Sequence, residues 1–191
     1  MKENSHKVRM MVEGGLCIAL AIALSFIKIP IGAGFGGFGG SIDFVMVPLL
    51  FFAIKWGPRW GCLAGLVFGT VKYFLGSGFV IHWISILFDY SLAYAAVGLA
   101  GVIGIFMKRS SPAANGIGAF LGCFGRFIIH YISGITVYAQ YMPEEFMNFK
   151  MTTPSIYSLL YNGTYMIPNT IIAIVIMVII AKPLKKLYEI D

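Results

Sequence analysis

Residues 157–181 read YSLLYNGTYMIPNTIIAIVIMVIIA, an apolar run that contains no charged side chain. A helix of about 20 apolar residues crosses the hydrocarbon core of a bilayer, where backbone polar groups must be hydrogen-bonded within the protein. The run therefore predicts a transmembrane helix. The composition of the whole chain agrees, because 59% of its residues are hydrophobic and only 12% are charged. Soluble domains are about a quarter charged, so we predict an integral membrane protein.

Five further apolar runs precede this one, and no alternating β-barrel pattern is present. We predict a single membrane-embedded domain over residues 1–191, an all-α membrane protein built as a six-helix transmembrane bundle. The predicted spans are 16–31, 44–54, 60–75, 84–106, 114–140 and 157–181. The second span is short, so it either extends back toward Gly40 or does not cross fully.

Basic residues gather before, between and after these spans on one side. Ten of the fourteen Lys and Arg residues fall there, which by the positive-inside rule predicts cytoplasmic N- and C-termini. We attribute the net charge of +6 to this topology and expect no nucleic-acid partner. The ten are Lys2, Lys7, Arg9, Lys55, Arg59, Lys108, Arg109, Lys182, Lys185 and Lys186.

A glycine-rich stretch, IGAGFGGFGGSIDF at residues 31–44, connects the first two predicted spans. Gly32, Gly34 and Gly37 spell G-x-G-x-x-G, but a dinucleotide fingerprint needs a preceding strand and a βαβ unit, which this context lacks. No G-x-x-x-x-G-K-[ST] motif occurs, so we expect no ATPase activity in this chain. The stretch is either a mobile lid over an outward-facing site or a flexible connector.

Five ionisable residues in the predicted spans or at their outer ends are singled out as candidates. A charge at the centre of a bilayer costs at least about 2.5–3.5 kcal/mol, so each such residue is a candidate for function. All five fall in, or can face, the outer half of the bundle, which predicts a polar pocket that opens outward. They are Asp43, Lys72, Asp89, Arg126 and His130.

Four residues spaced four apart, Arg126, His130, Gly134 and Tyr138, form one stripe on the fifth predicted helix. Gly134 would leave space between two side chains that flank a flat ligand. We predict that this stripe is one wall of the pocket and that Asp43 belongs to the same site. The alternative is that Arg126 only neutralises Asp89 or Asp43.

The fourth predicted helix carries a lone carboxylate beside an aromatic ring, at Asp89 and Tyr90. This pair suits a positively charged ligand, since ring faces add cation–π attraction to the charge of the carboxylate. Tyr138 and Tyr157 supply further rings, although an interfacial aromatic belt would also explain them. Asn162 offers a donor and an acceptor for the edge of a heterocycle. The three cysteines have no metal-ligand spacing, so we predict no metal site.

The first predicted helix carries a stripe of small residues, Gly15, Ala19 and Ala23. Such stripes let a second helix approach closely. The partner helix lies either within this chain or in another protein.

Four segments together resemble a known family. They are GGSIDFVMVPLL (39–50), HWISILFDYSLAYAAVGLAG (82–101), GRFIIHYISGITVYAQYMPEE (125–145) and YSLLYNGTYMIPN (157–169). This pattern resembles the thiamine-specific substrate-binding (S) component of energy-coupling factor (ECF) vitamin importers. The resemblance implies a six-helix bundle in the bacterial plasma membrane with an outward-facing thiamine site. It also implies a transmembrane coupling protein and two ABC-type ATPases as partners, with no cofactor and no covalent chemistry in this chain.

The resemblance also implies roles for particular residues. Asp89, Tyr90 and His130 would engage thiamine, Tyr138 would stack on its rings, and the last helix would contribute contacts from Tyr157 and Asn162. The coupling protein would dock on Gly15, Ala19 and Ala23, and the glycine-rich stretch would cover the bound vitamin. Asp89 stands where some relatives carry Glu, and Tyr138 where some carry Trp.

Three other functions compete with thiamine import. An S component for riboflavin or a pyridoxine-type compound would leave Asp89 without a cationic partner. An intramembrane enzyme would use Asp89 and His130 as an acid–base pair. A proton-coupled carrier would need polar groups spread across the membrane, whereas here they gather on one side.

Overall fold

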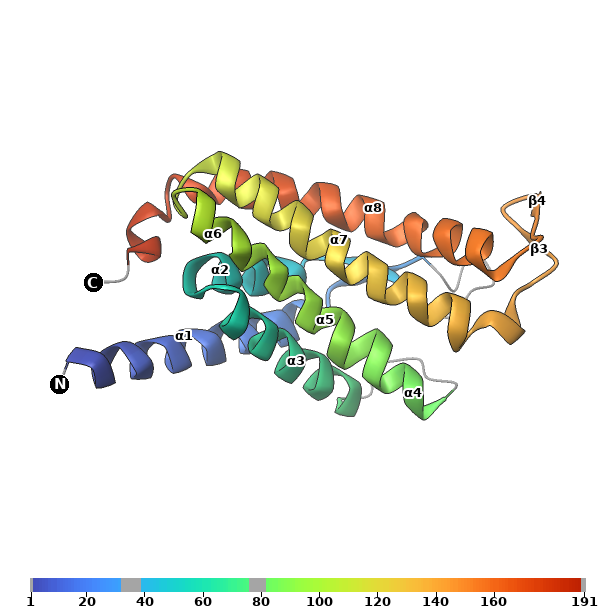
Figure 1. Ribbon diagram of the computed structural model, residues 1–191, viewed down its shortest axis with the longest axis horizontal. Helices are drawn as coiled ribbons and strands as arrows, with labels where there is room; N and C mark the ends of the chain where they lie inside the picture. The colour runs from blue at the N-terminus through green and yellow to red at the C-terminus, as the bar shows by residue number, and fades with distance from the viewer. Residues whose placement is uncertain (1, 32–38, 76–81, 190–191) are drawn as a thin grey trace.

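The computed structural model describes residues 2–31, 39–75 and 82–189, and helices dominate it (Figure 1). This confirms the predicted all-α class. The helical stretches are α1 (Lys2–Leu24), α2 (Met46–Trp56), α3 (Pro58–Phe74), an irregular helix from α4 (Trp83–Ser85) to α6 (Ile103–Phe106), α7 (Pro112–Thr136) and α8 (Pro154–Ala181).

Both termini lie at one end of the elongated bundle, and α4, β3 and β4 lie at the other (Figure 1). Lys55 falls in the last turn of α2 and Lys108 follows α6, so basic residues mark the turns of the chain at the terminal end. The common placement of the termini agrees with the predicted topology, whereas the side of the membrane that this end faces stays a prediction.

Three helices are long and apolar enough to cross a membrane within the part of the chain that the structure describes. They span Trp83–Phe106, Pro112–Thr136 and Pro154–Ala181. Charged residues occupy the first half of α1, and α2 has only 11 residues. Three of the six predicted crossings thus correspond to long apolar helices. The other three correspond to α1, α2 and α3, which are shorter or carry charged residues.

The first predicted span, 16–31, is wrong at its C-terminal end. Helix α1 stops at Leu24, and β1 (Lys28–Pro30) pairs antiparallel with β2 (Ser41–Asp43), with Lys28 opposite Asp43. Pro30 lacks the backbone donor that a helix would need, and it lies opposite Ser41 in this hairpin.

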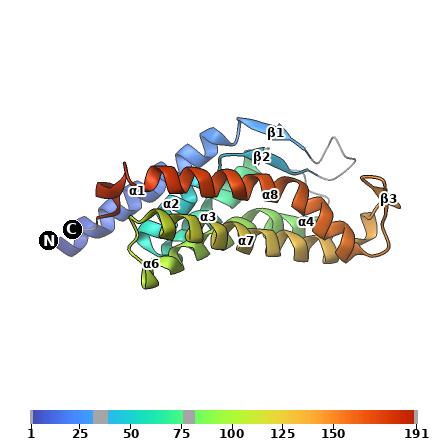
Figure 2. The same ribbon diagram turned by 90° about the horizontal axis from the view of Figure 1, so that it is seen from above.

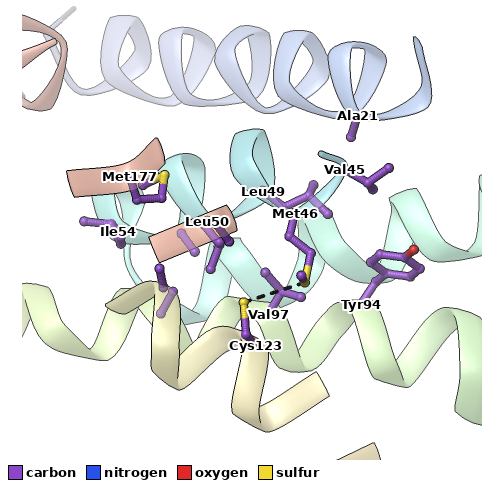
Figure 3. Packing of buried hydrophobic residues seen from close by; sticks show 14 of the residues in the cluster. Ala21, Val45, Met46, Leu49, Leu50, Ile54, Tyr94, Val97, Cys123 and Met177 are labelled. Carbon is purple, nitrogen blue, oxygen red and sulfur yellow. Dashed lines mark hydrogen bonds between the residues drawn. The ribbon is translucent and has the colours of Figure 1, made fainter. Parts of the chain in front are cut away.

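Helix α2 is short because protein rather than lipid surrounds it. Its side chains Met46, Leu49 and Leu50 are buried between Ala21 of α1, Cys123 of α7 and Met177 of α8 (Figure 3). A helix that is apolar on all sides belongs in a core. Strand β2 immediately precedes it, so α2 does not extend back to Gly40, and 11 residues cover only about 16 Å.

The fourth helix is irregular where a regular helix was predicted. It runs from α4 through the π-helix η2 (Ile86–Leu92), α5 (Ala93–Ala96) and the 3-10 helix η3 (Val97–Val102) into α6. Two glycines of α3 let the chains approach closely, because a Cβ on Gly65 would lie 2.0 Å from the carbonyl oxygen of Tyr94 and one on Gly69 2.2 Å from that of Tyr90. π-Helical turns are frequent at functional sites, and this one carries Asp89.

Helices α7 and α8 lie side by side in both views (Figures 1 and 2). Each begins with a hydroxyl cap followed by proline: Ser111 caps α7 and Thr153 caps α8. Helix α7 ends at Thr136, so the predicted span 114–140 is too long and Tyr138 lies beyond the helix. The short elements that remain are η4 (Ala139–Tyr141), β3 (Glu145–Phe146), β4 (Phe149–Lys150) and η5 (Lys185–Tyr188).

Candidate functional site

Asp89 is the carboxylate at the centre of the candidate site. Its Oδ1 lies 3.1 Å from Nδ1 of His130, and its Oδ2 accepts a hydrogen bond of 2.9 Å from the Ser133 hydroxyl. The Tyr138 hydroxyl also interacts with Asp89. The structure thus brings together the predicted residues Asp89, His130 and Tyr138, from η2, from α7 and from the turn that follows α7.

Arg126 lies behind His130, one helical turn away. Its Nε donates to Nε2 of His130 at 3.2 Å and its Nη2 to the Tyr94 hydroxyl at 3.1 Å. The guanidinium also stands 4.2 Å from the centroid of the Tyr94 ring. Within the described residues Nη1 is buried without a hydrogen-bond partner. Arg126 therefore reaches Asp89 through His130 rather than by direct contact.

Asp43 is the last residue of β2, shortly before α2, and its carboxylate accepts bonds from the Ser41 hydroxyl and the Val45 amide. Nζ of Lys72 lies 3.9 Å from its Oδ2. The Asp43 amide donates to Asn169 of α8. Asp43 thus fixes the β2–α2 junction to α3 and α8, and a contact of its carboxylate with a ligand stays a prediction.

Asn162 lies on α8 with its amide already bonded inside the protein. Its Nδ2 donates to the Ser158 carbonyl at 2.9 Å and the Ser158 hydroxyl at 3.1 Å, and its Oδ1 accepts from Tyr165. A ligand acceptor that bonds Nδ2 must therefore replace one of these partners, whereas the second lone pair of Oδ1 can accept a bond from a ligand donor.

The space predicted beside Gly134 is already filled. A Cβ at this position would lie 2.1 Å from Oγ of Ser158, so α8 packs directly on the glycine. Gly134 serves the contact between α7 and α8, and the prediction that it leaves a gap for a flat ligand is wrong. A role of Gly134 in ligand binding stays a prediction.

Tyr157 opens a ladder of rings along one face of α8. It stacks on Tyr161 at 5.6 Å between centroids, and Phe146 packs edge-on against it. Tyr161 contacts Tyr165, whose ring meets that of His130 at 6.0 Å. The ladder therefore runs from Tyr157 to the Asp89–His130 pair. The Tyr157 hydroxyl is buried and has no hydrogen-bond partner among the described residues.

Tyr90 takes a different position from its neighbour Asp89. Its ring packs on Tyr73 of α3 with the centroids 5.7 Å apart. Consecutive side chains of any helix point in different directions, so Tyr90 faces α3 while Asp89 faces α7.

Two polar side chains of the site, Ser133 and Tyr94, were not predicted as members. Ser133 bonds Asp89, and Tyr94 joins Arg126 to Lys72. Ser133 follows His130 by three residues, so its position on the same helical face was the available signal. Tyr94 gave no such signal, because its contacts depend on how closely α3 approaches the fourth helix.

The small residues Gly15, Ala19 and Ala23 are exposed on α1, and a Cβ on Gly15 would meet no atom of the described residues within 4 Å. The inward face of α1 uses Gly14 and Ala21 instead. The stripe is thus available to a second protein. The glycines Gly32, Gly34 and Gly37 of the proposed lid lie outside the described residues.

Comparison with known proteins identifies the family. The sequence profile of the thiamine transporter protein family matches residues 11–189. The chain is similar to thiamine transporter ThiT of Bacillus subtilis (28% identity, covering 100% of this chain and 99% of that protein) and of Lacticaseibacillus paracasei (24% identity, 91% and 88%). The solved structure of ThiT from Listeria monocytogenes has the same fold, with a TM-score of 0.79 at 24% identity over 95% of this chain and 98% of that one.

These matches span nearly the whole chain, and three apolar helices are long enough to cross a membrane. The chain is a multi-pass bacterial membrane protein that belongs to the thiamine transporter family.

Proposed function

We propose that this chain binds thiamine as the S component of an ECF importer, capturing the vitamin outside the cell and releasing it inward. Two of its relatives carry the name thiamine transporter. The site chemistry supports assigning the same ligand to this chain. The site lies at the end of the bundle away from the termini.

One observation carries the proposal. The groups that the described part of the chain provides around the Asp89 carboxylate are His130, Ser133 and Tyr138. All are neutral if His130 carries a single ring proton, so no cation from the described residues bonds Asp89 directly. A carboxylate in this setting favours a ligand with a fixed positive charge, such as the thiazolium ring of thiamine.

The rest of the site suits an aromatic heterocycle. Tyr157 and Tyr161 offer stacked faces, and the buried Tyr157 hydroxyl can donate to a ring nitrogen. Asn162 can exchange a bond to Ser158 for one to an aminopyrimidine edge. We further propose that Arg126, Tyr90 and Asp43 complete the site and that the bound vitamin leaves unchanged, without catalysis.

Transport energy would come from partner subunits. We propose a transmembrane coupling protein and two ABC-type ATPases, with the exposed α1 stripe of Gly15, Ala19 and Ala23 as the docking face. Both termini would then face the cytoplasm, where the ATPases lie.

Calorimetric titration of the purified full chain tests the proposal. We expect saturable binding of thiamine and no binding of riboflavin or pyridoxine. Asp89→Asn should weaken binding by about 30-fold or more, since a lost buried charge contact costs about 2 kcal/mol or more. His130→Ala should weaken it as well, because the bond that orients Asp89 is lost.

Glu144→Gln is the matched control, since it removes one negative charge from an exposed position in the loop between α7 and α8. This variant should bind thiamine like the natural chain. Binding of riboflavin instead of thiamine would reject the substrate assignment, and recovery of a chemically altered ligand would reject the proposal that the chain is not an enzyme.

A further inference from the structure

The buried side chains behind His130 form a chain of hydrogen bonds across three helices. Nζ of Lys72 donates to the Tyr94 hydroxyl at 2.7 Å, and Nη2 of Arg126 donates to the same oxygen at 3.1 Å. Arg126 then donates through Nε to His130, which contacts Asp89. Four of these side chains are at most 8% exposed: Tyr94 (1%), Lys72 (7%), Arg126 (7%) and His130 (8%).

The donor and acceptor capacities of the side chains determine which nitrogen of His130 carries a proton. A guanidinium only donates, so Nε2 of His130 must accept and cannot carry a proton. A carboxylate only accepts, so Nδ1 of His130 must carry the ring proton that points to Asp89. The hydrogen-bond partners on its two sides therefore select one of the two neutral tautomers of the ring.

We propose that Lys72, Tyr94 and Arg126 are positioning residues that hold His130 in its neutral Nδ1–H tautomer and thereby keep Asp89 oriented and negatively charged toward the ligand. The inference rests on the proposed function for the nature of that ligand. An imidazolium at His130 would place a donor against Arg126 and would offset the charge of Asp89. The bound cation would then lose its electrostatic partner.

We call the hydrogen-bonded series Lys72–Tyr94–Arg126–His130 the relay. Two features of the fold hold it in place. Gly65 and Gly69 bring α3 against the backbone of Tyr94 and Tyr90, and Lys72 follows on the same face of α3. The Tyr94 ring is itself fixed by an edge-on contact with Phe68, with centroids 4.7 Å apart. Its hydroxyl therefore stays where both cations can donate to it.

The electrostatic balance of the cluster supports the same assignment. Asp43 lies 3.9 Å from Lys72 at the far end of the relay. Lys72 thus meets the Asp43 carboxylate directly, and Lys72 and Arg126 share the neutral Tyr94 hydroxyl. The His130 ring stands between Arg126 and Asp89. The relay supplies hydrogen bonds to the site without placing a positive charge on Asp89.

Nitrogen-15 NMR of the full chain with labelled histidine tests the proposal directly. The chain has three histidines, and a His130→Gln variant identifies the signals of His130. The natural chain without ligand should show a protonated Nδ1 and an unprotonated Nε2. A protonated Nε2, alone or together with a protonated Nδ1, would overturn the relay.

Variants at Arg126 separate positioning from simple packing. Arg126→Gln keeps a donor for Nε2, whereas Arg126→Met keeps the side chain's apolar stem and removes the donor. We expect the Gln variant to retain the tautomer and the Met variant to lose it and to weaken thiamine binding by about tenfold, the loss of about 1.4 kcal/mol that one hydrogen bond to a charged group is worth. An unchanged tautomer in Arg126→Met would overturn the proposal.

Tyr94→Phe supplies an independent variant should Arg126→Met not fold. It keeps the ring that packs on Phe68 and removes only the oxygen, so a mixture of His130 tautomers is expected, and an unchanged spectrum would count against the role of Tyr94 and Lys72. The experiments distinguish a failure of the proposed function from a failure of the proposed relay. The expected tautomer in a chain that does not bind thiamine would reject the proposed function alone, and thiamine binding with a protonated Nε2 would reject the relay alone.

Discussion

Gly134 of α7 lies against Ser158 of α8, and this contact gives a prediction at the scale of one residue. A Cβ at position 134 would lie 2.1 Å from the Ser158 hydroxyl oxygen and 2.8 Å from its Cβ. We expect Gly134→Ala to lower the free energy of unfolding by about 1–3 kcal/mol, because overpacking forces one of the two helices to shift. Thermal unfolding in detergent measures the loss, and Ser158→Gly should restore part of it.

Gly15→Ala is the control for this prediction, because a Cβ there would lie more than 4 Å from every packing neighbour in the described part of the chain. Alanine also favours a helix over glycine, so this variant should unfold at the same temperature as the natural chain or slightly above. Equal destabilisation by both substitutions would contradict the packing argument.

The residues of the site divide into those that spacing reveals and those that it does not. Arg126 and His130 share a helical face at four-residue spacing, and the structure places them in contact. Tyr94 and Lys72 touch because α3 approaches the fourth helix at Gly65 and Gly69, which helical periodicity cannot indicate. Contacts along one helix follow from the sequence, whereas contacts between helices depend on packing distances.

At the scale of whole elements, Glu13 joins α1 to α2. Its carboxylate accepts hydrogen bonds from Nζ of Lys55 at 2.7 Å and from the Trp56 indole at 2.7 Å, and Arg9 adds a third at 3.0 Å. Glu13 precedes the first predicted span, and Lys55 is only 1% exposed. Burial by itself raises the pKa of the Glu13 carboxyl, but these bonds outweigh burial and leave its pKa below the ordinary value.

This lowered pKa predicts a pH-dependent stability. The bonds of the Glu13 carboxylate stabilise the fold fully above the pKa of the unfolded chain, and this contribution is lost as the pH falls through the lower pKa of the folded state. We expect Glu13→Gln to lower the unfolding temperature at neutral pH, since it leaves the buried Lys55 without its anion. The difference from the natural chain should shrink on acidification. A difference that does not change with pH would contradict the argument, and Glu144→Gln serves as the exposed control.

The elements also show where hydropathy succeeds and where it fails. The long apolar runs that became α7 and α8 were predicted within a few residues. The end of the first span was not predicted correctly. Ile27, Ile29 and Ile31 extend the apolar run, but the chain there forms a β-hairpin. The π-helix around Asp89 was not predicted either, since apolar periodicity does not distinguish it from a regular helix.

At the scale of the whole molecule, the exposed stripe on α1 predicts an assembly phenotype. Ala19→Trp should prevent a coupling protein from approaching α1 closely, because only small residues permit that contact. We expect the variant to bind thiamine normally but to lose co-purification with the coupling module. Ile179→Trp is the matched control on α8, at a position that is 65% exposed and away from the stripe. Loss of assembly in both variants, or in neither, would contradict the assigned docking face.

The central claim is that Asp89 recognises a positive charge, and one comparison of ligands tests it most directly. Calorimetry would measure the affinity of the natural chain and of Asp89→Asn for thiamine and for an analogue in which a neutral ring of the same size replaces the thiazolium. The natural chain should prefer thiamine by about tenfold or more, the equivalent of about 1.4 kcal/mol, and Asp89→Asn should lose most of that preference. An equal preference for thiamine in both proteins would show that Asp89 does not recognise the positive charge of the thiazolium, and it would contradict the account.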